Sequence, residues 1–153
     1  MDKSKVIAKL NEILKWEYAG LVQYTQFSFV VQDTFREVYY KFFRDNGEEA
    51  LDHAHQVGDK IVALGGVPTV ERAEVKQATD LIQMLEYSYE VESKQAELYT
   101  EALELCGERD VALRVLLEDL CRAEQEGADH LGKILKKHKL TATEQPKGHA
   151  KTG

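Results

Sequence analysis

Four long segments, in which apolar residues recur every three or four positions, limit most strongly what this chain can fold into. This spacing places apolar side chains along one face of an α-helix, so each segment is predicted to be an amphipathic helix. Each apolar face must pack against another helix to be stable in water. We therefore expect an all-α protein, with helices at about 4–31, 35–64, 80–106 and 110–138.

The breaks between these segments predict how the helices are connected. Short polar breaks, QDT at 32–34 and CGERD at 106–110, separate the first helix from the second and the third from the fourth. Connections this short join antiparallel neighbours. A longer stretch, GGVPTVERAEVKQAT at 65–79, follows the second helix; its two glycines are expected to end that helix, and Thr79 to cap the third. Two hairpins joined by one long crossover predict an antiparallel four-helix bundle.

The composition fits a single soluble domain. The chain has 153 residues, of which 43% are hydrophobic and 31% charged, enough for one core. We expect the bundle to span 1–139 and to be followed by a polar, disordered tail at 140–153. Neither the apolar region of a signal peptide nor a run of about 18 apolar residues is present, so we expect a cytoplasmic protein without a membrane partner.

The charge distribution bears on nucleic-acid binding. A net charge of -7 argues against duplex DNA as the main partner, because phosphate binding needs a basic surface. Residues 133–153 nevertheless contain six lysines and one glutamate. We interpret this segment as a solubilising tail, and the alternative is a tail that tethers DNA.

A carboxylate interrupts the apolar face near the middle of three helices. Glu17 lies on the first helix and Glu124 on the fourth, while His53 occupies the same place on the second. On the third helix Glu92 follows Tyr89, which is also expected on the apolar face. Residues equidistant from a hairpin turn face each other, so Glu17 should meet His53, and Glu92 should meet Glu124. A buried carboxylate must be paired, protonated or bound to a metal. The pattern favours a metal site, and the alternative is a hydrogen-bonded polar layer that fixes helix register.

The two hairpins also look like diverged copies of one unit. Glu17 and Glu92 each precede a tyrosine by seven residues, Tyr24 and Tyr99. Seven residues are two helical turns, so each tyrosine is expected on the same face as its glutamate.

These residues carry a resemblance to a known family. Together with the segments YYKFFRDNGEEALDHA, GGVP and LEDLCRAEQEGADHL, they are similar to the ferritin-like superfamily, and to bacterioferritins in particular, up to about residue 138. The resemblance implies a ferritin-like bundle whose di-iron site takes one Glu from each of the first and third helices and a Glu-x-x-His motif from each of the others.

The chain departs from that pattern at two positions. Ala50 stands where the family has the glutamate of the second helix, and Gly127 stands where it has the histidine of the fourth. Matching residue by residue leaves four of the six ligands: Glu17, His53, Glu92 and Glu124. Glu49 lies one helical turn before His53, and His130 lies one turn after Gly127. Both are candidates to replace the missing ligands.

The resemblance implies a ferroxidase that oxidises Fe(II) with dioxygen or peroxide for iron storage or detoxification. One or two iron ions per bundle are expected, and whether catalysis survives the loss of two ligands is left open. Tyr24 or Tyr99 could donate an electron to the oxidant. Haem is not expected, because Leu51 stands where bacterioferritins have the haem-binding methionine.

Two other functional classes remain alternatives. One is a DNA-protecting protein of the Dps type that uses the lysine-rich tail, and the other is a metal-free scaffold with a degenerate site. The resemblance also implies a homo-oligomer, either a dimer or a larger shell. Phe27, Phe29 and Tyr40 are expected to suit contacts between copies.

Overall fold

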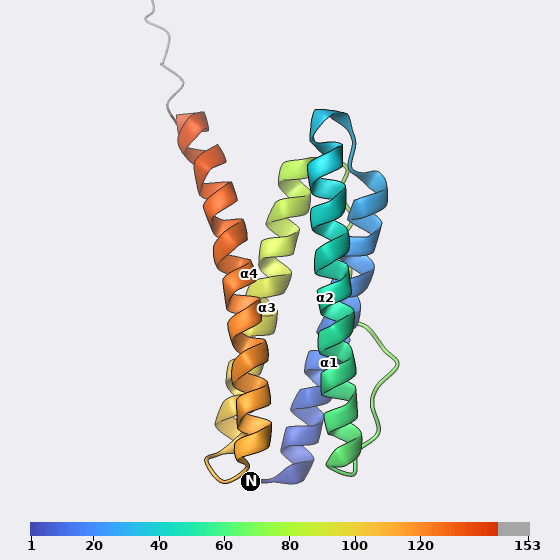
Figure 1. The fold of residues 1–153 in the computed structure, drawn as a ribbon, viewed down its shortest axis with the longest axis vertical. Coiled ribbons are helices and arrows are strands. Elements are labelled where there is room, and N and C mark those ends of the chain that lie inside the picture. Colours follow the sequence, from blue (N-terminus) through green and yellow to red (C-terminus); the bar gives the residue numbers. More distant parts are fainter. Residues whose placement is uncertain (144–153) are drawn as a thin grey trace, which may run out of the picture.

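The computed structural model describes the backbone of residues 1–143 and the side chains up to residue 136. It contains four long helices, and the short 3-10 helix η1 (Asp33–Phe35) joins the first two (Figure 1). The long helices are α1 (Lys3–Val30), α2 (Arg36–Ala63), α3 (Leu81–Cys106) and α4 (Val111–Thr143). The predicted all-α class and helix order are confirmed. Helix α4 continues to Thr143, so the predicted tail begins within it, and residues 144–153 lie outside the described part.

Local hydrogen bonds explain where the helices begin and end. Helix α2 ends at glycines, as predicted: Gly65 has a φ of 89°, and the Gly66 N–H donates to the Ile61 carbonyl at 2.9 Å. The cap of α3 differs from the prediction. Asp80, rather than Thr79, accepts a hydrogen bond from the Gln83 N–H at 3.0 Å, because Asp80 is the residue directly before the first helical turn.

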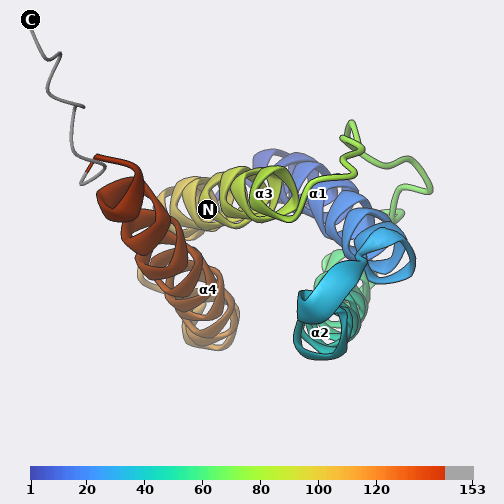
Figure 2. The same cartoon turned by 90° about the horizontal axis from the view of Figure 1, so that it is seen from above.

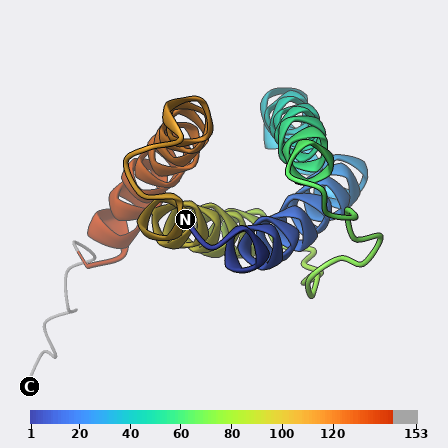
Figure 3. The same cartoon turned by 90° about the horizontal axis from the view of Figure 1, so that it is seen from below.

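The helices approach most closely in three pairs, α1 with α2, α3 with α4, and α1 with α3. Viewed along the bundle, α2 and α4 lie on the same side of the central α1–α3 pair (Figures 2 and 3). The long crossover runs along α1, since the Ala73 N–H donates to the Lys15 carbonyl and the Lys76 N–H to Gln23 Oε1. The predicted arrangement of two hairpins joined by a crossover is therefore confirmed.

The buried core has two apolar clusters at different heights. One cluster contains Leu10, Leu14, Val57, Leu98, Leu113 and Leu117, among others. The second contains Phe27, Val31, Phe43, Met84, Leu85 and Leu131, among others. Between the two clusters lie buried acidic and imidazole side chains, which the next section describes.

Two expectations about individual aromatic residues are wrong. Phe27 is fully buried, with its ring centroid 5.5 Å from that of Phe43, and cannot contact another copy. Tyr89 is 42% exposed and lies off the buried face of α3, where Ser88 is fully buried instead. Phe29 is 64% exposed, as a contact residue would be. In the part of the chain that the structure describes, none of the helices contains an apolar run long enough to cross a membrane.

Candidate metal centre

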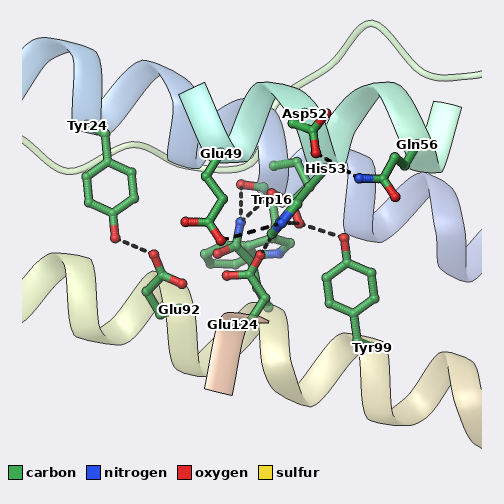
Figure 4. Close-up of polar contacts among 11 residues, drawn as sticks. Trp16, Tyr24, Glu49, Asp52, His53, Gln56, Glu92, Tyr99 and Glu124 are labelled. Atoms are coloured by element: carbon green, nitrogen blue, oxygen red, sulfur yellow. Dashed lines mark hydrogen bonds and ion pairs between the residues drawn. The ribbon is translucent and has the colours of Figure 1, made fainter. Parts of the chain in front are cut away.

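Each of the four long helices contributes one ionisable side chain to the layer between the apolar clusters. Glu17 of α1, His53 of α2, Glu92 of α3 and Glu124 of α4 are all at least 94% buried. The four residues predicted from the interrupted apolar faces therefore share one height in the bundle. Figure 4 shows His53 and Glu124 in the middle of this layer, with Tyr24 and Tyr99 on either side.

Three of these side chains converge tightly. Among the described residues, Glu17, His53 and Glu124 form a group whose possible ligand atoms all lie within 4.8 Å of one another. His53 Nδ1 is 2.6 Å from Glu124 Oε1 and 3.7 Å from Glu17 Oε1. One ring nitrogen thus faces two carboxylates, and it joins α2 to α4 across the bundle.

Neighbouring side chains hold these three groups in place. The Tyr99 hydroxyl donates to Glu17 Oε1 at 2.7 Å, and Gln95 Nε2 donates to Glu17 Oε2 at 3.1 Å. On the other side of the imidazole, His53 Nε2 lies 3.7 Å from Glu49 Oε1. Metal-binding histidines commonly direct their second nitrogen to a carboxylate in this way.

Glu92 is held separately from that group. The Tyr24 hydroxyl donates a short hydrogen bond to Glu92 Oε1. The same carboxyl group lies over Gly127, where an added Cβ would be only 2.8 Å from Glu92 Oε2. The place of the histidine that the family pattern has at position 127 is therefore taken by the Glu92 carboxyl.

The burial of the layer changes how its groups hold protons. Burial alone would lower the pKa of His53, but its hydrogen bonds and charge interactions with Glu124 and Glu17 raise that pKa from 6.5 to about 11. Burial raises the pKa of Glu17, and hydrogen bonds from His53 and Tyr99 offset part of this effect. Without a metal, the layer therefore holds an imidazolium that neutralises part of the carboxylate charge.

The two remaining carboxyl groups share a hydrogen bond. Burial raises the pKa of Glu92 well above its ordinary value, and the neighbouring Glu124 raises it further. Burial and the charge of Glu17 also raise the pKa of Glu124, whereas its hydrogen bonds with Glu92 and His53 lower it. Burial and the neighbouring Glu124 therefore favour the protonated form of Glu92.

The donor set fits a divalent metal ion. Two carboxylate oxygens and one imidazole nitrogen suit iron, manganese or zinc, and each donor has an outer partner that would orient it toward an ion. A small cavity of ≈ 10 Å³, lined by Glu17, Ala50, Glu92 and Glu124, adjoins them. This is about the volume of one water-sized sphere. A divalent ion that replaces the proton of His53 would neutralise one more unit of the carboxylate charge than that proton does.

The two candidates for replacing the missing ligands lie outside this group. Glu49 is 52% exposed at its side chain and faces His53 Nε2, on the side away from Glu17 and Glu124. His130 is exposed, with its ring 6.1 Å from the ring of Phe42. Neither belongs to the converging donor group in the described part of the chain.

The sequence interpretation missed Gln95 and the direction of the two tyrosine hydrogen bonds. Gln95 is 98% buried and binds Glu17. Its position three residues after Glu92 and four before Tyr99 could have revealed it, because that spacing places it on the same helical face. The tyrosines bond across the hairpins, Tyr24 of α1 to Glu92 of α3 and Tyr99 of α3 to Glu17 of α1.

Comparison with known proteins gives consistent matches over most of the chain. A family model described as a ferritin-like domain matches residues 7–141. The crystal structure of a ferritin-like, diiron-carboxylate protein from Bacillus anthracis superposes with a TM-score of 0.84 at 32% identity, covering 88% of this chain and 98% of that one.

Two curated relatives are more distant in sequence. A bacterial ferritin from Neisseria meningitidis serogroup B is 26% identical over 126 residues, covering 82% of each chain. A nutrient stress-induced DNA-binding protein from Nostoc sp. is 27% identical over 143 residues, covering 86% of this chain and 78% of that protein.

Proposed function

Because this chain belongs to the ferritin-like family, we propose that it binds Fe(II) within the bundle and oxidises it for iron storage or detoxification. The observation that carries the proposal is the convergence of Glu17, His53 and Glu124 in the middle of the core. Iron is the substrate here: Fe(II) enters, loses one electron to dioxygen or peroxide, and leaves as Fe(III). The likeness to a bacterial ferritin supports iron over other divalent metals.

The chain's own residues would bind the ion, and His53 would release the proton from its Nδ1 atom. Glu17 and Glu124 supply negative oxygen donors, and His53 Nδ1 supplies the nitrogen donor once its proton has left. Glu49 also lines the cavity, with Oε1 3.7 Å from His53 Nε2, and would keep the imidazole oriented. Tyr99 and Gln95 hold Glu17 in place from the opposite side.

Fe(II) oxidation in the purified full chain tests the proposal. Metal-free protein is loaded with Fe(II) under argon and mixed with dioxygen or hydrogen peroxide, and the ferric absorbance is followed by stopped flow. We expect oxidation faster than that of Fe(II) in buffer, and loss of the excess rate in His53→Ala. His55→Ala is the matched control, because His55 is exposed two residues further along the same helix. Equal rates with and without the protein would overturn the proposal.

DNA protection is the second candidate, favoured by the relative from Nostoc that is named as a DNA-binding protein. The lysine-rich segment at 133–153 would contact phosphates, and it lies partly outside the described residues. Binding would weaken steeply with added salt and disappear when residues 139–153 are deleted. A chain that neither oxidises iron nor binds DNA would be a scaffold.

A cytoplasmic location and assembly into a homo-oligomer are also part of the proposal. Exposed apolar side chains on α1 and α2, including Phe29 and Val38, support an interface between copies. Light scattering of the purified chain would establish the size of the assembly.

A further inference from the structure

The number of metal ions that the layer can hold depends on Glu92, which has three features. Its side chain is buried, it belongs to the same layer as the donor group, and its carboxyl group stands outside that group. A side chain that is buried near three converging donors but does not join them needs something that holds it elsewhere.

Tyr24 supplies one of the two contacts that hold Glu92. Its hydroxyl donates to Glu92 Oε1. Its ring packs in the second apolar cluster, with a centroid 6.3 Å from that of Phe43. The side chain is also almost completely buried, with only 2% of its surface exposed. The donor therefore has little freedom to follow Glu92 if that carboxyl group moves toward the other ligands.

Gly127 provides the space that the Glu92 carboxyl occupies. A Cβ at position 127 would lie 2.8 Å from Glu92 Oε2, which is closer than real Cβ atoms approach other heavy atoms, and 3.1 Å from Glu92 Cδ, which is a tight contact. Any larger side chain at position 127, a histidine included, would exclude this placement of Glu92. The glycine and the position of the glutamate therefore depend on each other.

Ala50 removes the remaining donor from α2. It is buried, and its Cβ would be 3.7 Å from a Cβ added to Gly20 of α1. A methyl group at this place offers no oxygen that could bridge two ions. The adjoining cavity of ≈ 10 Å³ has room for about one water-sized sphere.

From these contacts we propose that the space at Gly127 lets the Glu92 carboxyl lie outside the ligand set, where Tyr24 hydrogen-bonds to it, so that each bundle binds a single divalent ion through Glu17, His53 and Glu124. Glu92 is then a positioning residue that hydrogen-bonds to a ligand, and three protein ligands leave positions for water or an oxidant. This inference rests on the proposed function, since it concerns the same site.

Cobalt(II) is the probe that tests the number of ions, because its visible absorption reports ligation without the oxidation that Fe(II) undergoes. Metal-free full chain is titrated with Co(II) and followed by absorption, and bound metal is counted after equilibrium dialysis. We expect one ion per chain. Two ions per chain would overturn the inference and leave the proposed function standing. No bound ion would overturn both.

A pair of matched variants tests whether Glu92 is a ligand. Glu124→Gln should weaken Co(II) binding more than about 100-fold, whereas Glu92→Gln should weaken it by no more than the roughly 10- to 100-fold typical of a residue that hydrogen-bonds to a ligand. The Co(II) spectrum of Glu92→Gln should keep the wild-type shape. Equal losses in the two variants, or an altered spectrum in Glu92→Gln, would show that Glu92 binds the ion and would overturn the inference.

A second pair tests Gly127. Gly127→His fills the space under Glu92 and adds an imidazole, so it should raise the count from one ion to two. Gly127→Ala fills the space without adding a donor and should keep one ion. Circular dichroism checks that both variants remain folded. A count of one in folded Gly127→His would overturn the role assigned to Gly127.

Discussion

Glu17 and Glu92 occupy corresponding places in the two hairpins, and each accepts a hydrogen bond from a tyrosine of the other hairpin. Their remaining contacts differ. Glu17 faces the imidazole of His53 at 3.7 Å and accepts a second bond from Gln95, and its contacts with His53 and Tyr99 offset part of the rise in its pKa that burial causes. The Glu92 carboxyl lies beside Glu124 and fills the space at Gly127, and burial and Glu124 raise its pKa well above the ordinary value. The surroundings of the same residue type thus oppose protonation in one half of the repeated motif and favour it in the other.

The largest effect is expected from removing the charge of Glu17. Glu17→Gln leaves the imidazolium of His53 with only one of its two buried carboxylate partners, and breaking a buried ion pair from one side costs about 3 kcal/mol. Urea denaturation of the full chain with a chelator present, at fixed protein concentration, measures this loss. A variant more stable than wild type would show that Glu17 is an unpaired buried charge and that the two halves do not differ as described.

The pH dependence of the metal-free protein is the next expected effect. Because the pKa of His53 is raised from 6.5 to about 11, its stabilising contribution is complete below pH 6.5 and is lost as the pH rises toward 11. The raised pKa of Glu17 acts in the same direction, since a folded state that binds a proton more tightly loses stability above pH 4.5.

Unfolding free energies of the metal-free chain should therefore decrease steadily from pH 6.5 to 9. In His53→Ala this slope should be reduced, while His55→Ala should keep it. If His53→Ala leaves the slope unchanged, groups other than His53 cause the pH dependence of the unfolding free energy.

Removing the hydroxyl of Tyr99 should cost more stability than removing that of Tyr24, although both losses are smaller than the loss in Glu17→Gln. Tyr99→Phe removes a hydrogen bond to a carboxylate and should cost about 2 kcal/mol, whereas Tyr24→Phe removes one to a neutral carboxyl and should cost about 1 kcal/mol. Neither change leaves a large void, because only the hydroxyl is lost. Thermal or urea unfolding with a chelator present compares the two, and the reverse order would place the charge on Glu92.

Much of this layer could be predicted from the sequence, because a helix repeats its faces regularly. The interrupted apolar faces predicted that Glu17, His53, Glu92 and Glu124 share one layer, and all four are buried there. Ala50 and Gly127 could be recognised as departures from the family pattern. What filled the space at Gly127 could not be predicted, since it depends on the rotamer of a side chain on another helix.

The separation of Glu92 from the donor group could not be predicted either, because it also depends on side-chain rotamers. Spacing along a helix places a residue on a face, but it does not fix where the end of a long side chain lies. Glu49 and His130 each lie within one turn of a motif residue, and the structure directs the first to the outer side of His53 and the second to the surface. Distances of this kind are decided by packing between helices.

The smallest effect is expected from Glu92→Gln, which tests the difference between Glu17 and Glu92 most directly. A protonated carboxyl and a carboxamide have nearly the same shape, so Gln at position 92 can accept from Tyr24 through its oxygen and donate to Glu124 through its nitrogen. The metal-free chain should lose less than about 1 kcal/mol, because no charge is removed and both hydrogen bonds are retained. Measured by the same urea denaturation as Glu17→Gln, a loss of similar size in both variants would show that Glu92 is ionised, and the two halves of the layer would then be equivalent.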